Sequence, residues 1–183
     1  MSFANPAQNA SAAAASYVSA LMELLGDKEP LSVQRQLLTS VHQVVDAMSS
    51  NELQQPEAPG KWSVHDIVRH LMHTEMVYAY RYRVTVAQDR PNIPGFDQDA
   101  WSTMLKSDGN DLTQNLARLS MLRSWNLEFL ESRSADELQD EGKHEERGWE
   151  SLAHQIKLGA AHDLVHRRQL LRVREMVTSG NER

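Results

Sequence analysis

The sequence has no cysteine among its 183 residues. This absence excludes disulfides, zinc motifs built on cysteine and a cysteine nucleophile. The chain also has no apolar run that approaches the roughly 20 residues of a membrane-spanning helix. Its alanine-rich beginning lacks the positive charge and the strongly apolar core of a secretion signal. We therefore expect a cytoplasmic protein without a membrane partner.

Positive charge is also scarce. Lysine and arginine total 19 against 25 aspartates and glutamates, which gives a net charge of −6 and a pI near 5.7. A general nucleic-acid-binding protein needs a basic face to displace counterions from phosphates, so we expect no nucleic-acid partner. The content of 40% hydrophobic and 24% charged residues is typical of globular proteins. The length suits a single domain over residues 1–183, with loose ends at 1–10 and 178–183.

What the sequence does have is helical periodicity along almost its whole length. Apolar residues recur at intervals of three and four, as they do on one face of an α-helix. The breaks fall at stretches rich in glycine, proline and polar residues. No segment alternates convincingly between apolar and polar residues, so we expect no sheet. The pattern favours an all-α helical bundle, with predicted helices at 12–25, 31–53, 63–88, 97–105, 111–133 and 151–176.

The residues most suited to chemistry are among the eight histidines. His162 and His166, in “GAAHDLVHRRQL”, are one helical turn apart, so both side chains share a face and can direct ring nitrogens at one cation. Catalytic zinc sites usually take three protein ligands, and the third should come from a facing helix. In “WSVHDIVRHLMHTE”, His70 lies on the face expected to point inward. His73, one turn away, is the reserve candidate.

Asp66 comes one turn before His70 and would orient the ring of that histidine. Its alternative role is to place negative charge at the N-terminus of a helix. The histidine pair has a simpler interpretation as well, because such pairs occur by chance and short motifs produce false matches. An inward histidine is more often a core residue than a ligand. The residues alone therefore leave a metal site and a packed core as two open alternatives.

Two segments resemble a known family. “GKWSVHDIVRHLMHTE” resembles the second-helix signature of the DinB/YfiT-like superfamily of metalloenzymes, and “RGWESLAHQIKLGAAHDLVHRRQL” resembles its final-helix signature, in which Gln169 follows the two histidines. The resemblance covers residues 16–175. It implies a four-helix bundle with one long crossover, here with an extra N-terminal helix. It also implies a homodimer and a divalent metal ion, such as zinc or nickel, held by His70, His162 and His166.

Some members of this family transfer low-molecular-weight thiols to electrophiles. Our first hypothesis is therefore a divalent-metal-dependent transferase that uses a small-molecule thiol. The alternatives are a metal-dependent hydrolase, which would need a general base near the metal, and a non-enzymatic metal-binding stress protein. In each case Asp66, His73 and Gln169 are the candidates to orient the ligands or to contact the substrate.

Overall fold

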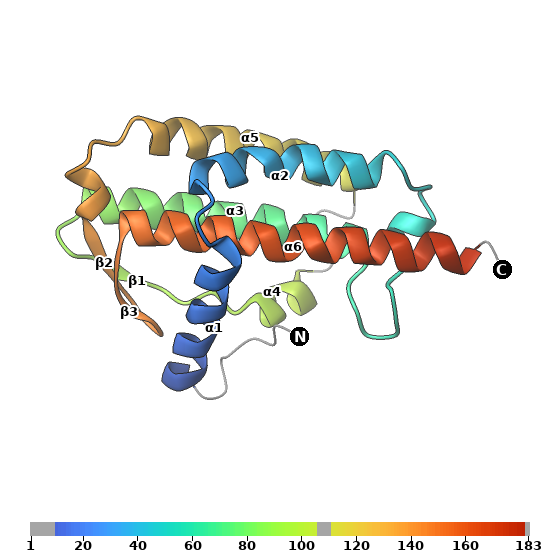
Figure 1. The fold of residues 1–183 in the computed structure, drawn as a ribbon, viewed down its shortest axis with the longest axis horizontal. Helices are drawn as coiled ribbons and strands as arrows, with labels where there is room; N and C mark the ends of the chain where they lie inside the picture. Colours follow the sequence, from blue (N-terminus) through green and yellow to red (C-terminus); the bar gives the residue numbers. More distant parts are fainter. Residues whose placement is uncertain (1–9, 106–110, 182–183) are drawn as a thin grey trace.

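The computed structural model describes residues 10–105 and 111–181 (Figure 1). Four long helices form a bundle in which α2 packs against α6, α6 against α3, α3 against α5, and α5 against α2. Their bounds are Pro30–Val45 for α2, Val64–Ala87 for α3, Leu112–Glu131 for α5 and Leu152–Asn181 for α6. This architecture confirms the predicted four-helix bundle.

The connection between α3 and α5 is the predicted long crossover. These two helices run in the same direction, so the chain between them must return along the length of the bundle (Figure 1). The returning segment carries strand β1 (Asn92–Ile93) and the short helix α4 (Gln98–Met104). In Figure 1 it passes below α3 and α6, whereas α2 and α5 lie above them. The α3–α6 pair therefore lies between two layers.

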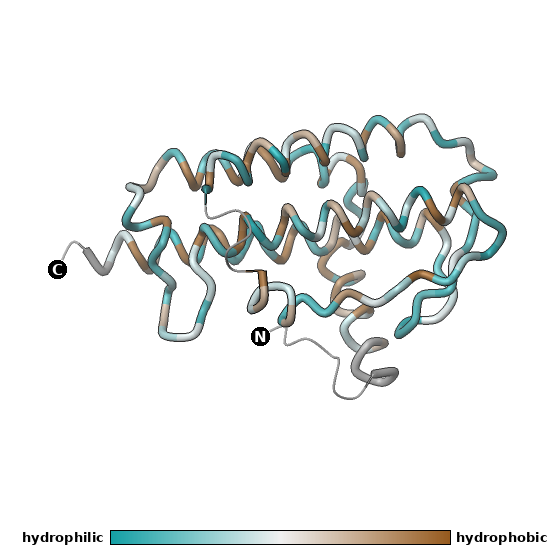
Figure 2. Tube along the Cα trace, turned by 180° about the vertical axis from the view of Figure 1, so that it is seen from behind, coloured by the Kyte–Doolittle hydropathy of each residue, from teal (hydrophilic) through white to brown (hydrophobic). Residues whose placement is uncertain are grey.

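One apolar cluster fills the bundle. Leu37 of α2, Ile67 of α3, Leu119 of α5 and Leu170 of α6 are completely buried in it. Burial of such a side chain contributes roughly 1.5–3 kcal/mol before the entropy cost of folding. Figure 2 shows apolar and hydrophilic residues succeeding one another along each long helix. The helical periodicity of the sequence thus corresponds to the face that each helix buries.

The extra N-terminal helix α1 (Ala10–Leu25) lies outside the bundle and packs against α6. Its Leu21 and Leu25 share a buried cluster with Ala160 and Ala161 of α6. The neighbouring Gly159 contacts α3 so closely that an added Cβ would lie 2.7 Å from the Tyr82 hydroxyl. Small residues on this turn of α6 therefore let other helices approach closely.

The expectation that the chain has no sheet was wrong. Strands β2 (Glu141–His144) and β3 (Gly148–Ser151) form a hairpin, and β1 adds to β2 in parallel. Together they make a three-stranded sheet in the order β1-β2-β3. Its strands are two to four residues long and rich in polar residues, whereas strand propensity favours β-branched and aromatic ones. Such strands carry too little alternation for a pattern search to detect.

Helix ends also differ from the prediction. The helix predicted at 31–53 ends at Val45, and the rest of that range holds a turn and the short helix η1 (Glu52–Gln54), where the Glu52 carboxylate accepts a hydrogen bond from the Ser49 backbone. A second short helix, η2, covers Glu137–Gln139. The last helix continues through residue 181, so the C-terminal end that we expected to be loose from residue 178 is helical over its described part. At the other end, residues 1–9 lie outside the described residues. Within the described chain, no helix combines the length and apolar character that a membrane crossing requires.

Candidate metal centre

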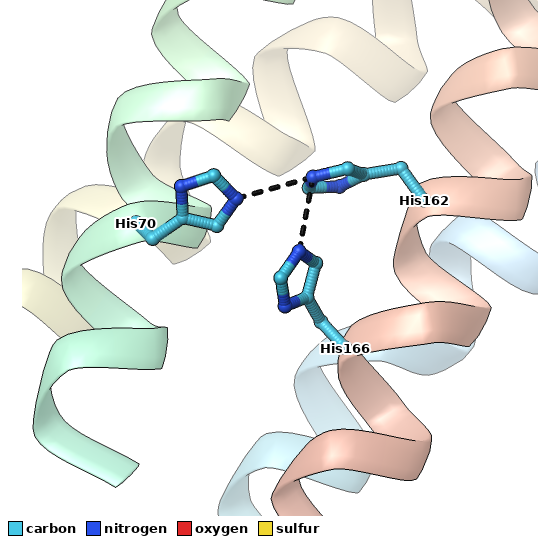
Figure 3. Close-up of side chains that lie close together, drawn as sticks. All are labelled: His70, His162 and His166. Carbon is cyan, nitrogen blue, oxygen red and sulfur yellow. Dashed lines mark hydrogen bonds between the residues drawn. The ribbon is translucent and has the colours of Figure 1, made fainter. Parts of the chain in front are cut away.

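Helix α3 begins in a way that fixes the position of His70. Ser63 caps the helix by accepting a hydrogen bond from the Asp66 backbone, and the Asp66 carboxylate accepts one from the Ser63 backbone. This capping box is worth roughly 1 kcal/mol and sets the first turn. His70 follows one turn after Asp66 and is 5% exposed. Its side chain points toward α6 (Figure 3).

The two histidines of α6 complete a group of three. The His162 Nε2 atom lies 3.1 Å from the Nε2 atom of His70 and 3.1 Å from the Nε2 atom of His166. One ligand atom from each ring lies within 4.8 Å of the other two. Figure 3 shows the three rings converging from the facing helices α3 and α6. The structure thus brings together the three histidines singled out in the sequence.

The spacing of these nitrogens suits a shared ion better than a set of hydrogen bonds. His166 Nδ1 lies 2.8 Å from the Gln169 amide oxygen, which can only accept, so Nδ1 carries the proton and Nε2 presents a lone pair. A neutral His162 can donate its Nε2 proton to only one of its two neighbours. Two imidazole nitrogens bound tetrahedrally at zinc distances would be about 3.3 Å apart. The observed 3.1 Å separations are close to that value.

Burial keeps these three rings neutral. It lowers the pKa of His70 and of His162 well below the usual range, and the neighbouring histidines lower both further. Burial also lowers the pKa of His166 to about 4, although the hydrogen bond to Gln169 raises it. A neutral imidazole is the form that binds metal. At neutral pH the three rings are therefore free of extra protons and in the form that can bind a metal ion.

The remaining candidates take different positions. Gln169 contacts His166 and holds its ring, as described above. Asp66, which we expected to orient His70, instead contacts Ser63 and forms a 2.7 Å ion pair with Arg69. His73 is buried one turn from His70, and its ring packs edge-on against Trp101 at a centroid distance of 5.5 Å.

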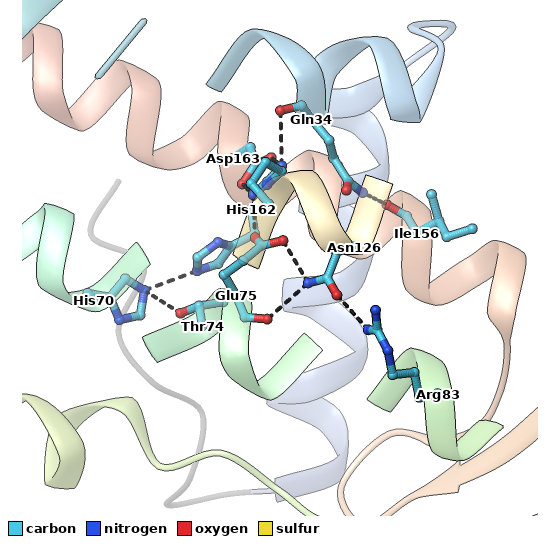
Figure 4. A network of polar contacts seen from close by, with 10 residues as sticks. Gln34, His70, Thr74, Glu75, Arg83, Asn126, Ile156, His162 and Asp163 are labelled. Carbon is cyan, nitrogen blue, oxygen red and sulfur yellow. Dashed lines mark hydrogen bonds and ion pairs between the residues drawn. The ribbon is translucent and has the colours of Figure 1, made fainter. Parts of the chain in front are cut away.

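Sequence reasoning missed a buried charge network next to the histidines (Figure 4). Arg123 of α5 contacts the Asp163 carboxylate at 2.6 and 3.1 Å and the Glu75 carboxylate at 2.6 Å. Asn126 donates a 2.8 Å hydrogen bond to the other Glu75 oxygen. Burial raises the pKa of Asp163 to about 6, while Arg123 lowers it. One feature of the sequence could have revealed this network: the charged residue Arg123 follows the core residue Leu119 by one turn, on the same face of α5.

The network and the histidine group meet at a small cavity. Its volume is about 10 Å³, which is at most the room for one water molecule. His162, Thr74, Glu75 and Arg123 are among the residues that line it. Thr74 also contacts His70, with its hydroxyl oxygen 3.3 Å from Nε2. The side of the histidine group that faces α2 and α5 is therefore filled by protein.

Aromatic rings lie on the other side of the histidine group. Trp62, in the segment before α3, has its ring 4.8 Å from the His70 ring and 6.2 Å from the His166 ring. Phe96 of the crossover stacks 6.3 Å from His70 and contacts Trp101 of α4 edge-on at 5.0 Å. We call Trp62, Phe96 and Trp101 the aromatic cover. All three side chains are half-buried.

A four-helix bundle with three converging histidines between two of its helices defines a candidate metalloprotein. The model of the DinB superfamily matches residues 34–170, and the chain belongs to this superfamily. A relative from Bacillus subtilis, named “Putative metal-dependent hydrolase YfiT”, is 28% identical over 92 residues. This match covers 50% of the chain and about half of the relative's length, at 52%.

Two other comparisons cover more of the chain. A relative from Bacillus mycoides, named “Putative metal-dependent hydrolase BcerKBAB4_2443”, is 23% identical over 87% of this chain and 91% of its own length. The solved structure of YfiT from Bacillus subtilis, described as a probable metal-dependent hydrolase with an unusual four-helix bundle topology, matches with a TM-score of 0.69. It covers 78% of this chain and 84% of that chain at 23% identity, which shows a shared fold.

Proposed function

We propose that this chain holds one divalent metal ion through His70, His162 and His166 and uses it to transfer a low-molecular-weight thiol to an electrophile. The observation that carries the metal site is the convergence of three histidine rings, with Nε2 of His162 lying 3.1 Å from Nε2 of His70 and 3.1 Å from Nε2 of His166. Imidazole nitrogens suit zinc, nickel, copper and iron, so the ligand set is compatible with zinc or nickel. The relatives named as metal-dependent support this part of the proposal.

The chain's own residues prepare the site for this chemistry. Gln169 fixes the tautomer of His166, and burial keeps all three rings neutral, so they leave the charge of an ion undiminished. A divalent ion at this position lowers the pKa of a thiol or water beside it, which supplies a nucleophile at neutral pH. In the transfer, the thiol sulfur forms a bond to the electrophilic carbon, the leaving group departs with its electron pair, and the thiol proton passes to solvent.

Hydrolysis is the second candidate, and the names of the relatives favour it. A hydrolase of this kind benefits from a carboxylate that takes a proton from water. The carboxylates of Glu75 and Asp163 are both engaged by Arg123, and that of Asp66 is engaged by Arg69. Thiol transfer does not need such a base, because a thiol is far more acidic than water. We therefore place transfer first.

The test begins with the metal content of tag-free protein, measured by elemental mass spectrometry. We expect about one ion per chain, lost in the His162→Ala/His166→Ala double variant and retained in His73→Ala. Loss of the ion in His73→Ala with retention in His70→Ala would contradict the ligand assignment. No ion in the wild-type protein, even after incubation with zinc or nickel, would overturn the metal site.

Turnover assays on the loaded protein then separate the three functions. Conjugation of glutathione, cysteine or coenzyme A to monochlorobimane would support the transferase. Cleavage of p-nitrophenyl acetate without any thiol would support the hydrolase. A stoichiometric ion without either activity would favour a non-enzymatic metal-binding stress protein.

Three further expectations belong to this proposal. We propose that residues 1–183 form one DinB-like domain, that the protein works in the cytoplasm, and that it forms a homodimer. Light scattering on the purified protein measures the last of these directly, and a monomer at micromolar concentration would contradict it.

A further inference from the structure

The histidine group lies between two unlike surroundings. On the side of α2 and α5, polar contacts fill the space, with Arg123 bonded to Asp163 and to the backbone carbonyl of Gln34. On the side of the crossover, the aromatic cover lies against the histidine rings. A ligand that approaches an ion at this site from the side of the crossover would therefore meet the aromatic cover.

The aromatic cover is not simply an extension of the core. Trp62 packs at the edge of the main apolar cluster, whereas Phe96 and Trp101 contact His70 and His73. Helix α4, which carries Trp101, has no fully buried residue. Large rings that stay half-buried beside three candidate ligands present apolar faces to an incoming molecule. Aromatic faces are also concentrated here in a chain that has only 6% aromatic residues.

Phe96 is held in place through its neighbours in the chain. The Pro94 carbonyl accepts a 2.9 Å hydrogen bond from the guanidinium of Arg81, which is 5% exposed. The Gly95 backbone donates a 3.0 Å hydrogen bond to the Glu145 carboxylate. Two long-range contacts therefore fix the backbone just before the ring. A backbone fixed before binding loses little further entropy when a ligand stacks on the ring that it carries.

We infer that the aromatic cover recognises a flat, unsaturated group of the molecule that binds at the metal centre. Aromatic rings stack favourably with other π-systems, beyond the gain from apolar area alone. They also attract cations, but a cationic group here would lie close to a divalent ion and be repelled by it. This inference rests on the proposed metal site. The substrate class that it gives for that site is an electrophile whose reacting carbon adjoins an aromatic ring or conjugated double bonds.

The test compares two hydroxamate probes of similar size, one with an aromatic six-membered ring and the other with a saturated one. The full chain is loaded with cobalt, and benzohydroxamate and cyclohexanecarbohydroxamate are titrated while the visible absorption of the cobalt is followed. We expect benzohydroxamate to bind about threefold to tenfold more tightly in the wild-type protein, as one good aromatic contact provides. In Phe96→Leu and Trp101→Leu, which keep apolar bulk but lose the ring face, the ratio should fall toward one. Trp149→Leu, at an exposed tryptophan of β3, is the matched control and should keep the wild-type ratio.

The outcomes separate this inference from the metal site itself. Equal affinity of the two probes for the cobalt-loaded wild-type protein would overturn the recognition of a flat group and leave the metal centre standing. A wild-type ratio that persists in both leucine variants would also overturn it. Failure of the protein to take up cobalt, zinc or nickel would overturn both proposals.

Discussion

The side chain of Gln169 accepts a hydrogen bond from Nδ1 of His166, one turn earlier on α6, at 2.8 Å. Because this contact fixes the tautomer, it decides which ring nitrogen His166 presents to the other two histidines. Through this hydrogen bond, Gln169 controls the orientation of one candidate metal ligand without lying among the ligands itself.

Loss of this hydrogen bond should weaken metal binding. In Gln169→Leu we expect the dissociation constant for zinc to rise about 10-fold to 100-fold, the range typical when a partner of a ligand histidine is removed. Competition with a chromophoric chelator measures it. Gln169→Glu keeps an acceptor at the same place and should bind zinc about as tightly as wild type. If the leucine variant binds zinc like wild type, Gln169 has no positioning role.

The buried network predicts a stability difference between two arginine variants. Arg123→Met leaves Glu75 and Asp163 buried without their cation, so we expect it to lower the free energy of unfolding by about 3–5 kcal/mol. Arg35→Met removes an exposed ion pair with Glu131 and should cost at most about 1 kcal/mol. Urea denaturation at pH 7.5 measures both. Similar losses in the two variants would show that the buried network adds nothing beyond a surface pair.

His144 predicts a pH dependence of stability. It is 1% exposed, and burial together with the positive charges of Arg147 and Arg81 lowers its pKa to about 3. The unfolded chain takes up a proton at this residue below about pH 6.5, whereas the folded protein does not. The stability that the neutral ring contributes is therefore complete above pH 6.5 and is lost progressively as the pH falls toward 3.

The variant His144→Asn tests this dependence, because its amide oxygen can still accept the hydrogen bond from the Glu146 backbone. The stability advantage of wild type over this variant should shrink by about 2 kcal/mol between pH 7.5 and pH 5. Urea denaturation in the presence of a chelator measures it, with Lys143→Asn at the adjacent exposed position as the control. An advantage that stays constant over this range would contradict the buried neutral state of His144.

Helical periodicity was enough to predict the bundle, because each long helix buries one stripe of apolar residues. The proximity of His70 to His162 needed more, since periodicity places each residue on a face and says nothing of which faces meet. The resemblance to the DinB/YfiT-like superfamily supplied that pairing. Gln169 was within reach of sequence reasoning because it shares a helix with His166.

Other features depend on contacts that a linear pattern does not reveal. Arg123 contacts Glu75 and Asp163 only when α3, α5 and α6 come together. The sequence of its own helix shows only that a charged residue lies on an apolar face. The aromatic cover likewise unites residues from two separate segments, the stretch before α3 and the crossover. The hairpin strands are short and polar, so Gly142 and His144 give little sign that they alternate inward.

The chain has no cysteine, yet the histidine group offers it a reversible cross-link. His70 and His162 are 92 positions apart, so an ion that joins them would close a long loop of the chain. A closure of this length removes several kcal/mol of conformational freedom from the unfolded ensemble when a disulfide makes it. An ion that binds the folded protein more tightly than the unfolded chain also stabilises the fold by mass action. If the ion binds at the proposed site, the supply of metal would therefore set the free energy of unfolding of the protein, independently of any reaction at the ion.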